Sequence, residues 1–163
     1  MSFNDMHTEK IYHENRHAVC QRTRRSARGI VIKNGKLLLV KNEKQDIFML
    51  PGGGLEDGET IEECCVRELL EETGYICKTI STKIKVEEYC HEMCFLGQYF
   101  VCEIIAQGEK HLTEDEKKLG CAVHWVDLQE ALTMFENYEQ HKDYWEKFST
   151  YLRDHTGLKY ALS

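Results

Sequence analysis

Three glutamates near the end of a predicted helix are the residues in this chain best suited to carry out chemistry. Glu68, Glu71 and Glu72 fall within an arc of about 100° on one helical face. Carboxylates this close repel one another when no positive charge lies between them. A hard divalent cation relieves that repulsion, because Mg²⁺ takes oxygen ligands and is commonly completed by substrate phosphates. The cluster therefore indicates a metal-dependent enzyme that acts on phosphate compounds.

The helix that carries these glutamates has a start signal and a stop signal in the sequence. Thr60 is the predicted N-cap, and Glu63 completes a capping box with it. Gly74 supplies the C-terminal stop. We therefore expect a helix of about four turns over 60–73.

The segment before this helix predicts a hairpin followed by a glycine turn. Asn34-Gly35 lies between two β-rich runs, 27–33 and 36–41, and this dipeptide favours a type I′ turn. A short apolar run then ends at Pro51, which is the only proline and stops strand pairing because it has no N–H.

The remainder of the chain alternates between strands and helices. Strand-like runs occupy 77–88, 97–105 and 123–126, and helices are predicted over 127–136 and 139–155. The last helix carries an aromatic stripe that we interpret as core packing: Tyr144, Trp145, Phe148, Tyr151 and Leu152. Strands with helices between and after them indicate one mixed α/β layered domain, which suits a chain of 163 residues.

Composition is that of an ordinary globular protein, with 42% hydrophobic and 30% charged residues. No apolar run reaches the roughly 18 residues that a membrane span requires. The polar N-terminus lacks the apolar core of a signal peptide, which favours a cytoplasmic location. The eight cysteines form no C-x-x-C pair, so we interpret them as reduced strand and core thiols.

The net charge of −7 argues against general nucleic-acid binding. An acidic protein that handles an acidic substrate needs local positive charge, which a bound cation supplies. A cluster of arginines is a second source of positive charge, or else the solvated face of a strand: Arg22, Arg24, Arg25 and Arg28. Arg25 and Arg28 are our candidates for substrate binding.

The spacing of the whole segment is far more specific than the glutamates alone. Its fixed charged and glycine positions are Gly53, Glu59, Arg67, Glu68, Glu71, Glu72 and Gly74, and Leu69 takes a bulky apolar position between them. Seven such identities, at about 7% each, coincide by chance roughly once in 10⁸ windows. The pattern resembles the signature of the Nudix hydrolase (MutT-like) family, G-x5-E-x7-R-E-U-x-E-E-x-G-U, where U is a bulky apolar residue. Tyr75 takes the last position, where an aliphatic residue is more usual.

The flanking residues extend the resemblance over most of the chain. They include the predicted hairpin, the Leu-Pro-Gly-Gly entry to the signature, and the run from His124 to Leu132. The resemblance implies a Nudix fold, a mixed β-sheet sandwiched between helices, over 24–163 with its signature at 53–75. Residues 1–23 would then be an N-terminal extension.

The family resemblance also implies an activity, a cofactor and roles for the signature residues. Its members use Mg²⁺ or Mn²⁺ and water to hydrolyse a nucleoside diphosphate linked to another group, by attack at phosphorus. Carried over by position, four groups would hold the metal: the carboxylates of Glu68, Glu71 and Glu72 and the carbonyl of Gly52. Arg67 and Glu59 would orient these glutamates.

The general base that takes a proton from the attacking water has two candidate positions. Family members use either the glutamate of the Arg-Glu pair, here Glu68, or a glutamate on a later loop. A polar loop is expected over 108–120, and within it we favour Glu116 over Glu114. The sequence leaves the choice between Glu68 and the loop open.

The substrate is not identified by residues outside the signature. His91, Glu92 and Met93 occupy positions where particular subfamilies carry a proline or a tyrosine. We expect a small nucleotide-derived diphosphate as ligand, with a homodimer as one expected state. The alternatives are a Nudix-fold sensor that binds a nucleotide without turnover and, ranked last, an enzyme similar to isopentenyl diphosphate isomerase.

Overall fold

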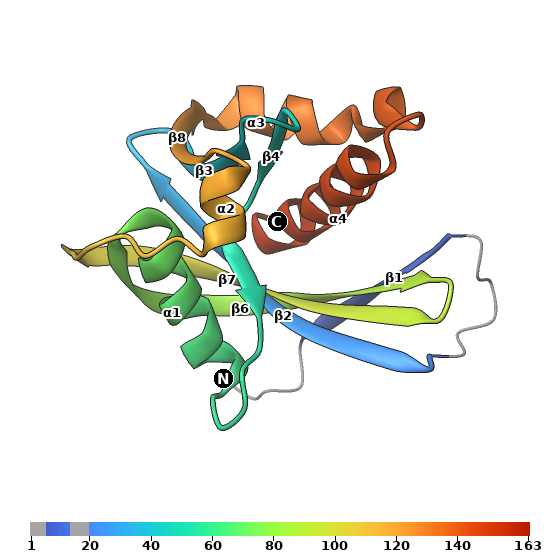
Figure 1. The fold of residues 1–163 in the computed structure, drawn as a ribbon, viewed down its shortest axis with the longest axis horizontal. Coiled ribbons are helices and arrows are strands. Elements are labelled where there is room, and N and C mark those ends of the chain that lie inside the picture. The colour runs from blue at the N-terminus through green and yellow to red at the C-terminus, as the bar shows by residue number, and fades with distance from the viewer. Residues whose placement is uncertain (1–5, 14–19) are drawn as a thin grey trace.

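The computed structural model describes residues 6–13 and 20–163, in which helices lie between and after the strands (Figure 1). The strands are β1 (His7–Tyr12), β2 (Arg22–Lys33), β3 (Lys36–Asn42), β4 (Ile47–Met49), β5 (Gly52–Gly54), β6 (Tyr75–Cys90), β7 (Met93–Gln107) and β8 (Cys121–Asp127). The helices are α1 (Ile61–Thr73), α2 (Glu114–Lys118), α3 (Leu128–Glu136), the 3₁₀-helix η2 (Tyr138–His141) and α4 (Trp145–Ala161). None of these helices is long and apolar enough to cross a membrane.

Strand β2 joins two parts of one mixed sheet. Along most of its length it pairs in parallel with β7, and at its end it turns into β3 through Asn34 and Gly35. Both turn residues have positive φ, 52° and 74°, as a type I′ turn requires. The strand order is β1-β6-β7-β2-β3-β4, with β5 beside β2 and β8 beside β3. The predicted hairpin and the mixed α/β class are confirmed.

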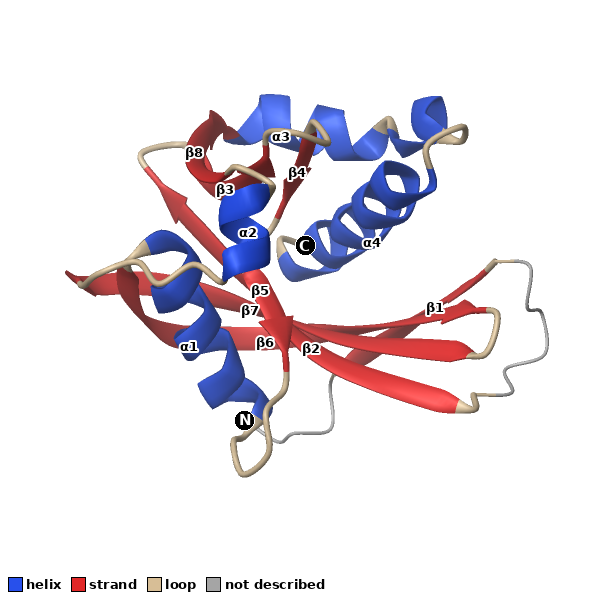
Figure 2. Ribbon diagram, in the orientation of Figure 1, coloured by secondary structure: helices blue, strands red, loops and turns tan. Residues whose placement is uncertain are grey.

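Helices lie on both faces of the sheet, as Figure 2 shows. Alternate residues of β2 and β3 feed two separate cores, because successive side chains of a strand leave opposite faces. Ala27 and Leu38 pack with α1, whereas Ile30 and Leu39 pack with α3 and α4. The α1 core also contains four of the eight cysteines as buried thiols: Cys64, Cys65, Cys77 and Cys102.

Helix α1 has the bounds that its sequence signals predict. The Thr60 side chain accepts the backbone N–H of Glu63, and the Glu63 side chain accepts that of Thr60. Gly74 ends the helix in the left-handed conformation, with φ 80°. The helix approaches β2 closely at Gly29, where an added Cβ would lie 2.8 Å from Leu69 Cδ1. The two caps therefore determine where α1 begins and ends, and Gly29 allows the helix to pack close to β2.

The N-terminal segment that the sequence left as an extension contributes a strand to the same sheet. Strand β1 pairs in parallel with β6, with His7 opposite Ile84 and Tyr12 opposite Tyr89. Parallel pairing is non-local, so no hairpin signal in the sequence could predict it. Residues 1–5 and 14–19, also assigned to that extension, lie outside the described residues.

The C-terminal helix differs from the prediction in position and in its buried face. Instead of one helix over 139–155, η2 ends at His141 and α4 runs from Trp145 to Ala161. Tyr151 of the predicted aromatic stripe is buried, but Trp145 is 43% exposed. The inward face continues through residues that the stripe did not include: Asp154, Thr156, Gly157, Leu158 and Ala161. Gly157 stands where a helix stop is expected shortly after 155, but it lies inside α4 against the Tyr99 ring, and the helix continues to Ala161.

A buried ionic cluster fastens β1 and β6 to α4. His13 Nε2 lies 2.8 Å from Glu88 Oε2, Ser149 Oγ donates to that oxygen at 3.0 Å, and Arg153 Nη1 donates to Glu88 Oε1 at 3.3 Å. Burial alone would raise the pKa of Glu88, but the hydrogen bond with His13 and the charge of Arg153 outweigh it and lower the pKa.

This cluster predicts an acid-dependent stability difference between the wild type and Glu88→Gln. A lowered folded-state pKa contributes stability above the unfolded value, and that stability is lost as pH falls through the folded value. At pH 7 we expect the variant to lose about 1–3 kcal/mol of unfolding free energy. Urea unfolding between pH 7 and pH 3 should show this difference shrinking as the pH falls. A pH-independent difference would contradict the assignment.

Candidate active site

Arg67 is the centre of the glutamate cluster. Its Nε and Nη2 donate to the two carboxylate oxygens of Glu59 at 3.0 and 2.7 Å. Its Nη1 donates to Glu68 Oε1 at 3.0 Å and to Glu71 Oε2 at 3.1 Å, and Nη2 also reaches the Gly54 carbonyl at 3.0 Å. These bonds use all five N–H groups of the guanidinium. The hydrogen bonds from Arg67 hold the pKa of Glu59 at about 2.

Glu72 lies on the same helix but turns away from Arg67. Its Oε2 accepts the backbone N–H of Gly52 at 3.0 Å. Burial raises the pKa of Glu72 to about 8, against the opposing effects of Arg28 and of the Gly52 N–H, and the charge of Glu68 adds to the rise. Burial also raises the pKa of Glu68, although Arg67 opposes it. The two carboxylates thus form a region of poorly compensated negative charge.

The glycine loop lies directly against these carboxylates. A Cβ added to Gly53 would overlap the Glu68 carboxylate, and one added to Gly52 would overlap the Ala27 carbonyl. The Gly52 carbonyl accepts a hydrogen bond from Arg28 Nη1 at 3.1 Å. A carbonyl oxygen has two lone pairs, so this bond leaves one free for another partner.

The backbone just before the glycines is held from two sides. The Gly29 N–H of β2 donates to the Pro51 carbonyl at 2.8 Å. The Leu50 N–H donates to Asp154 Oδ2 of α4 at 2.9 Å. Asp154 was not among the residues singled out from the sequence. Its signal was a carboxylate on a helical face whose other members are apolar or small.

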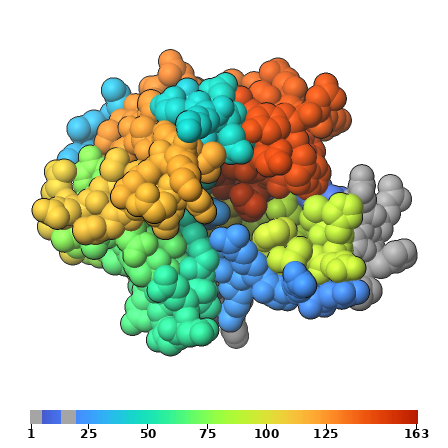
Figure 3. All heavy atoms as spheres, viewed as in Figure 1, coloured from blue at the N-terminus to red at the C-terminus, as the bar shows by residue number. Residues whose placement is uncertain are grey.

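The 108–120 segment was predicted as a polar loop, but it contains helix α2. The missed signal was a second capping box: the Thr113 Oγ1 accepts the Glu116 N–H at 3.2 Å, and Glu116 Oε2 accepts the Thr113 N–H at 2.7 Å. The His111 N–H donates to the Glu71 carbonyl at 2.8 Å, which ties the segment to the end of α1. In Figure 3 its amber surface lies between the green surface of α1 and the orange-red surface of the C-terminal helices.

The two glutamates proposed on this segment have different surroundings. Glu114 is exposed and pairs with Lys117 at 3.1 Å. Glu116 lies close enough to the cluster that its charge adds to the raised pKa of Glu72. Burial is the chief cause of the raised pKa of Cys121, and the charge of Glu116 raises that pKa further. Of the two glutamates, Glu116 is therefore the one whose charge acts on Glu72, while its Oε2 accepts the Thr113 N–H.

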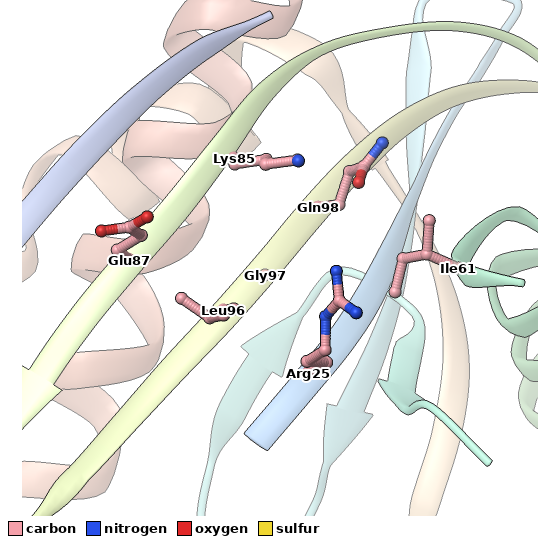
Figure 4. A pocket seen from close by; sticks show the side chains of 7 residues that line it. All are labelled: Arg25, Ile61, Lys85, Glu87, Leu96, Gly97 and Gln98. Carbon is pink, nitrogen blue, oxygen red and sulfur yellow. The ribbon is translucent and has the colours of Figure 1, made fainter. Parts of the chain in front are cut away.

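The two arginines proposed to bind substrate do not share one site. Arg28 donates to the carbonyls of Leu50 and Gly52, beside the glutamates. Arg25 instead lines a cavity of about 110 Å³ between the start of α1 and strands β2, β6 and β7 (Figure 4). The cavity is bounded by Arg25, Ile61, Lys85, Glu87, Leu96, Gly97 and Gln98. The side chains of Arg25 and Arg28 lie on opposite faces of β2, because they are three residues apart on a strand.

The carboxylates are not already gathered around one point. Within 6–13 and 20–163, no three His, Cys, Asp or Glu side chains form a ready metal-binding group. Glu68 and Glu71 each turn one oxygen to Arg67, and Glu72 turns one to the Gly52 N–H. A shared cation would require side-chain rotations or use of the second oxygen of each carboxylate.

Comparison with known proteins agrees with the family resemblance of the sequence. The family model described as NUDIX domain matches residues 23–148. An ADP-ribose pyrophosphatase of Methanocaldococcus jannaschii is 52% identical over 56 residues, which are 32% of this chain and 33% of that protein, so the match spans about a third of this relative. An ADP-ribose pyrophosphatase of Bacillus subtilis is 29% identical over 140 residues, or 81% of this chain and 71% of that protein.

Solved structures show the same architecture. A NUDIX hydrolase from Nitrosomonas europaea superposes with a TM-score of 0.58 over 66% of this chain and 74% of its own, at 23% identity. At that identity the likeness establishes the fold alone. The family match covers most of the chain and includes every signature residue from Gly53 to Gly74. This chain belongs to the Nudix family.

Proposed function

We propose that this protein hydrolyses the phosphoanhydride bond of a nucleoside diphosphate linked to another group, by attack of water at phosphorus. The observation that carries the proposal is the poorly compensated charge of Glu68 and Glu72 beside the Gly52–Gly53 backbone. Such charge favours binding of a cation, and a cation in turn attracts phosphate oxygens.

Four groups would hold Mg²⁺ or Mn²⁺: the carboxylates of Glu68, Glu71 and Glu72 and the Gly52 carbonyl. The donor set fits, because all four present oxygen and hard divalent cations prefer oxygen. Arg67 contacts only one oxygen of Glu68 and one of Glu71. When bound, such an ion polarises phosphoryl oxygens and lowers the pKa of a coordinated water.

The chain's own residues would orient the ligands and move the proton. Arg67 and Glu59 would keep the glutamates in place through their five-bond network. Arg28, beside the Gly52 carbonyl, would add positive charge near the substrate phosphates. Glu116 or Glu68 would accept the proton from the attacking water. We favour Glu116, because Arg67 already engages Glu68.

The substrate class rests on the relatives, two of which are named ADP-ribose pyrophosphatases. A panel of ADP-ribose, nucleotide sugars, dinucleoside polyphosphates, nucleoside triphosphates and a 5′-triphosphorylated RNA oligonucleotide, assayed with Mg²⁺ and with Mn²⁺, tests the proposal. Arg25 and its cavity are proposed to contact the group distant from the reacting phosphates, so Arg25→Ala should change KM more than kcat. Tight binding without turnover of any compound would favour a nucleotide sensor instead.

Glu72→Gln should separate function from folding. Glutamine keeps the acceptor for the Gly52 N–H and is always neutral. The folded-state pKa of about 8 lies above pH 7, so the wild-type carboxylate must take up a proton on folding, which lowers stability at pH 7. We expect a thermal midpoint in EDTA at or above that of the wild type, with kcat lower by about 10² or more.

Differential scanning fluorimetry with and without Mg²⁺ checks the same variant. Metal should raise the midpoint of the wild type and of Glu62→Gln, an exposed control on the same helix, but not that of Glu72→Gln. Equal metal stabilisation of all three proteins would remove Glu72 from the ligand set.

Arg67→Lys should impair both catalysis and acid stability. Lysine keeps the charge but cannot form the paired bonds to Glu59, so the glutamates lose their fixed positions and kcat should fall by about 10². The lowered pKa of Glu59 contributes stability above about 4.5, and this is lost as pH falls toward about 2. The stability gap between the variant and the wild type, followed by acid titration of circular dichroism, should therefore narrow over that range. Wild-type kinetics in this variant would refute the orienting role.

Glu116→Gln tests the base with the α2 cap preserved, since glutamine also serves at this position of a capping box. We expect kcat to fall by about 10²–10⁴. The matched control Glu114→Gln, two residues earlier and solvent-exposed, should retain its rate. A loss of only a few-fold in Glu116→Gln would assign the proton to Glu68.

A further inference from the structure

We propose that Asp154, on the C-terminal helix α4, is a positioning residue for the candidate active site. It would set the place of the Pro51–Gly53 backbone, and through that backbone the places of Glu72 and of the Gly52 carbonyl. The inference rests on the proposed function for its catalytic consequence, but its structural step stands independently.

Asp154 is 1% exposed, and both of its carboxylate oxygens have a partner from another element. Oδ2 accepts the Leu50 N–H at 2.9 Å, and Oδ1 accepts the Tyr99 hydroxyl at 3.0 Å. The Tyr99 hydroxyl also lies 3.1 Å from the Arg153 carbonyl. A single carboxylate therefore connects α4, strand β7 and the segment that enters the glycine loop.

A close contact on α4 allows this arrangement. The ring of Tyr99 is fully buried against Gly157, where any added Cβ would overlap the ring. A glycine inside a helix costs about 1 kcal/mol relative to alanine. Here that glycine brings β7 near enough for Tyr99 to reach Asp154, three residues earlier on the same helix.

The backbone from Leu50 through Pro51 to Gly52 is short and stiff, so the position of Leu50 affects that of Gly52. Pro51 follows Leu50 directly, and its ring fixes φ, so a shift at Leu50 is passed on to Gly52. The Gly52 N–H is the group that Glu72 accepts at 3.0 Å. Arg28 Nη1 spans the same path by donating to the Leu50 carbonyl at 3.4 Å and the Gly52 carbonyl at 3.1 Å.

Core packing alone does not call for a carboxylate here. The neighbours of Asp154 on the buried face include Tyr151, Leu158 and Ala161, and an apolar side chain would avoid the cost of burying a charge. Burial raises the pKa of Asp154, while Arg153 and Arg28 oppose the rise. The hydrogen bond that Asp154 accepts from the Leu50 N–H explains why a carboxylate occupies this position.

The test compares four variants of the full chain at a temperature where circular dichroism shows each one folded. Asp154→Ala removes both acceptors, whereas Asp154→Asn keeps an oxygen for the Leu50 N–H and an amide for Tyr99. Tyr99→Phe removes only the second partner. Thr156→Val is the matched control, because Thr156 is buried on the same helix but donates only to the Leu152 carbonyl at 2.7 Å.

Two readouts do not depend on turnover. Amide hydrogen exchange should be faster at Leu50 by about 10-fold or more in Asp154→Ala, relative to other buried amides, and unchanged in the other three variants. Mn²⁺ binding, followed by the paramagnetic relaxation of water protons, should weaken by about 10-fold in Asp154→Ala alone. With a substrate from the panel, kcat in that variant should fall by about 10-fold or more with KM within about 2-fold, and asparagine should restore it.

The outcomes separate the two proposals. Wild-type exchange at Leu50 in Asp154→Ala overturns the positioning role whatever the kinetics are. Equal losses of kcat in Asp154→Ala and Thr156→Val would also overturn it, because the effect would then be general destabilisation. If the wild type hydrolyses nothing, the proposed function fails, while the exchange and Mn²⁺ results still decide whether Asp154 positions the loop.

Discussion

The approach of the glycine loop to the glutamate helix is the constraint on which this structure depends. Gly53 has no side chain, and the Glu68 carboxylate lies in the place that a Cβ on Gly53 would otherwise fill. The same loop offers the Gly52 N–H to Glu72 and the Gly54 carbonyl to Arg67. Backbone polar groups and side-chain carboxylates are thereby brought together in a space that excludes other side chains.

The glutamate cluster has two electrostatically different ends, one around Arg67 and one at Glu72. Arg67 directs its five N–H groups to Glu59, Glu68, Glu71 and the Gly54 carbonyl, which holds that end in place although only one oxygen of Glu68 is engaged. At the other end, Glu72 has a raised pKa and only the Gly52 N–H and the more distant charge of Arg28 to oppose it. Hydrogen bonds thus hold the Arg67 end in place, while burial disfavours the charged form of Glu72 at the other end.

Residues far from the signature hold this arrangement in place. Strand β2 supplies the Gly29 N–H and the Arg28 guanidinium, and α4 supplies Asp154. Adjacent to Asp154, Arg153 joins Glu88 and His13 in the cluster that fastens β1 and β6 to the same helix. The C-terminal helix thus connects the outer strands of the sheet to the loop at the candidate site.

What the sequence by itself determined was local. The bounds of α1 follow from Thr60, Glu63 and Gly74, the type I′ turn follows from Asn34-Gly35, and the family follows from the spacing between Gly53 and Gly74. Each of these depends on residues a few positions apart, so a short sequence pattern is enough to predict it. The capping box at Thr113 and Glu116 was equally local, and it was available in the sequence although we expected a loop.

Only the tertiary structure decided how distant segments meet. The parallel pairing of β1 with β6 and the hydrogen bond from the His111 N–H to the Glu71 carbonyl each join residues that no short pattern relates. Asp154 is the clearest case, because its role is set by Leu50, about a hundred positions earlier, and by the gap that Gly157 leaves for Tyr99. Contacts of that kind depend on how whole helices and strands pack against one another, which a local sequence pattern does not specify.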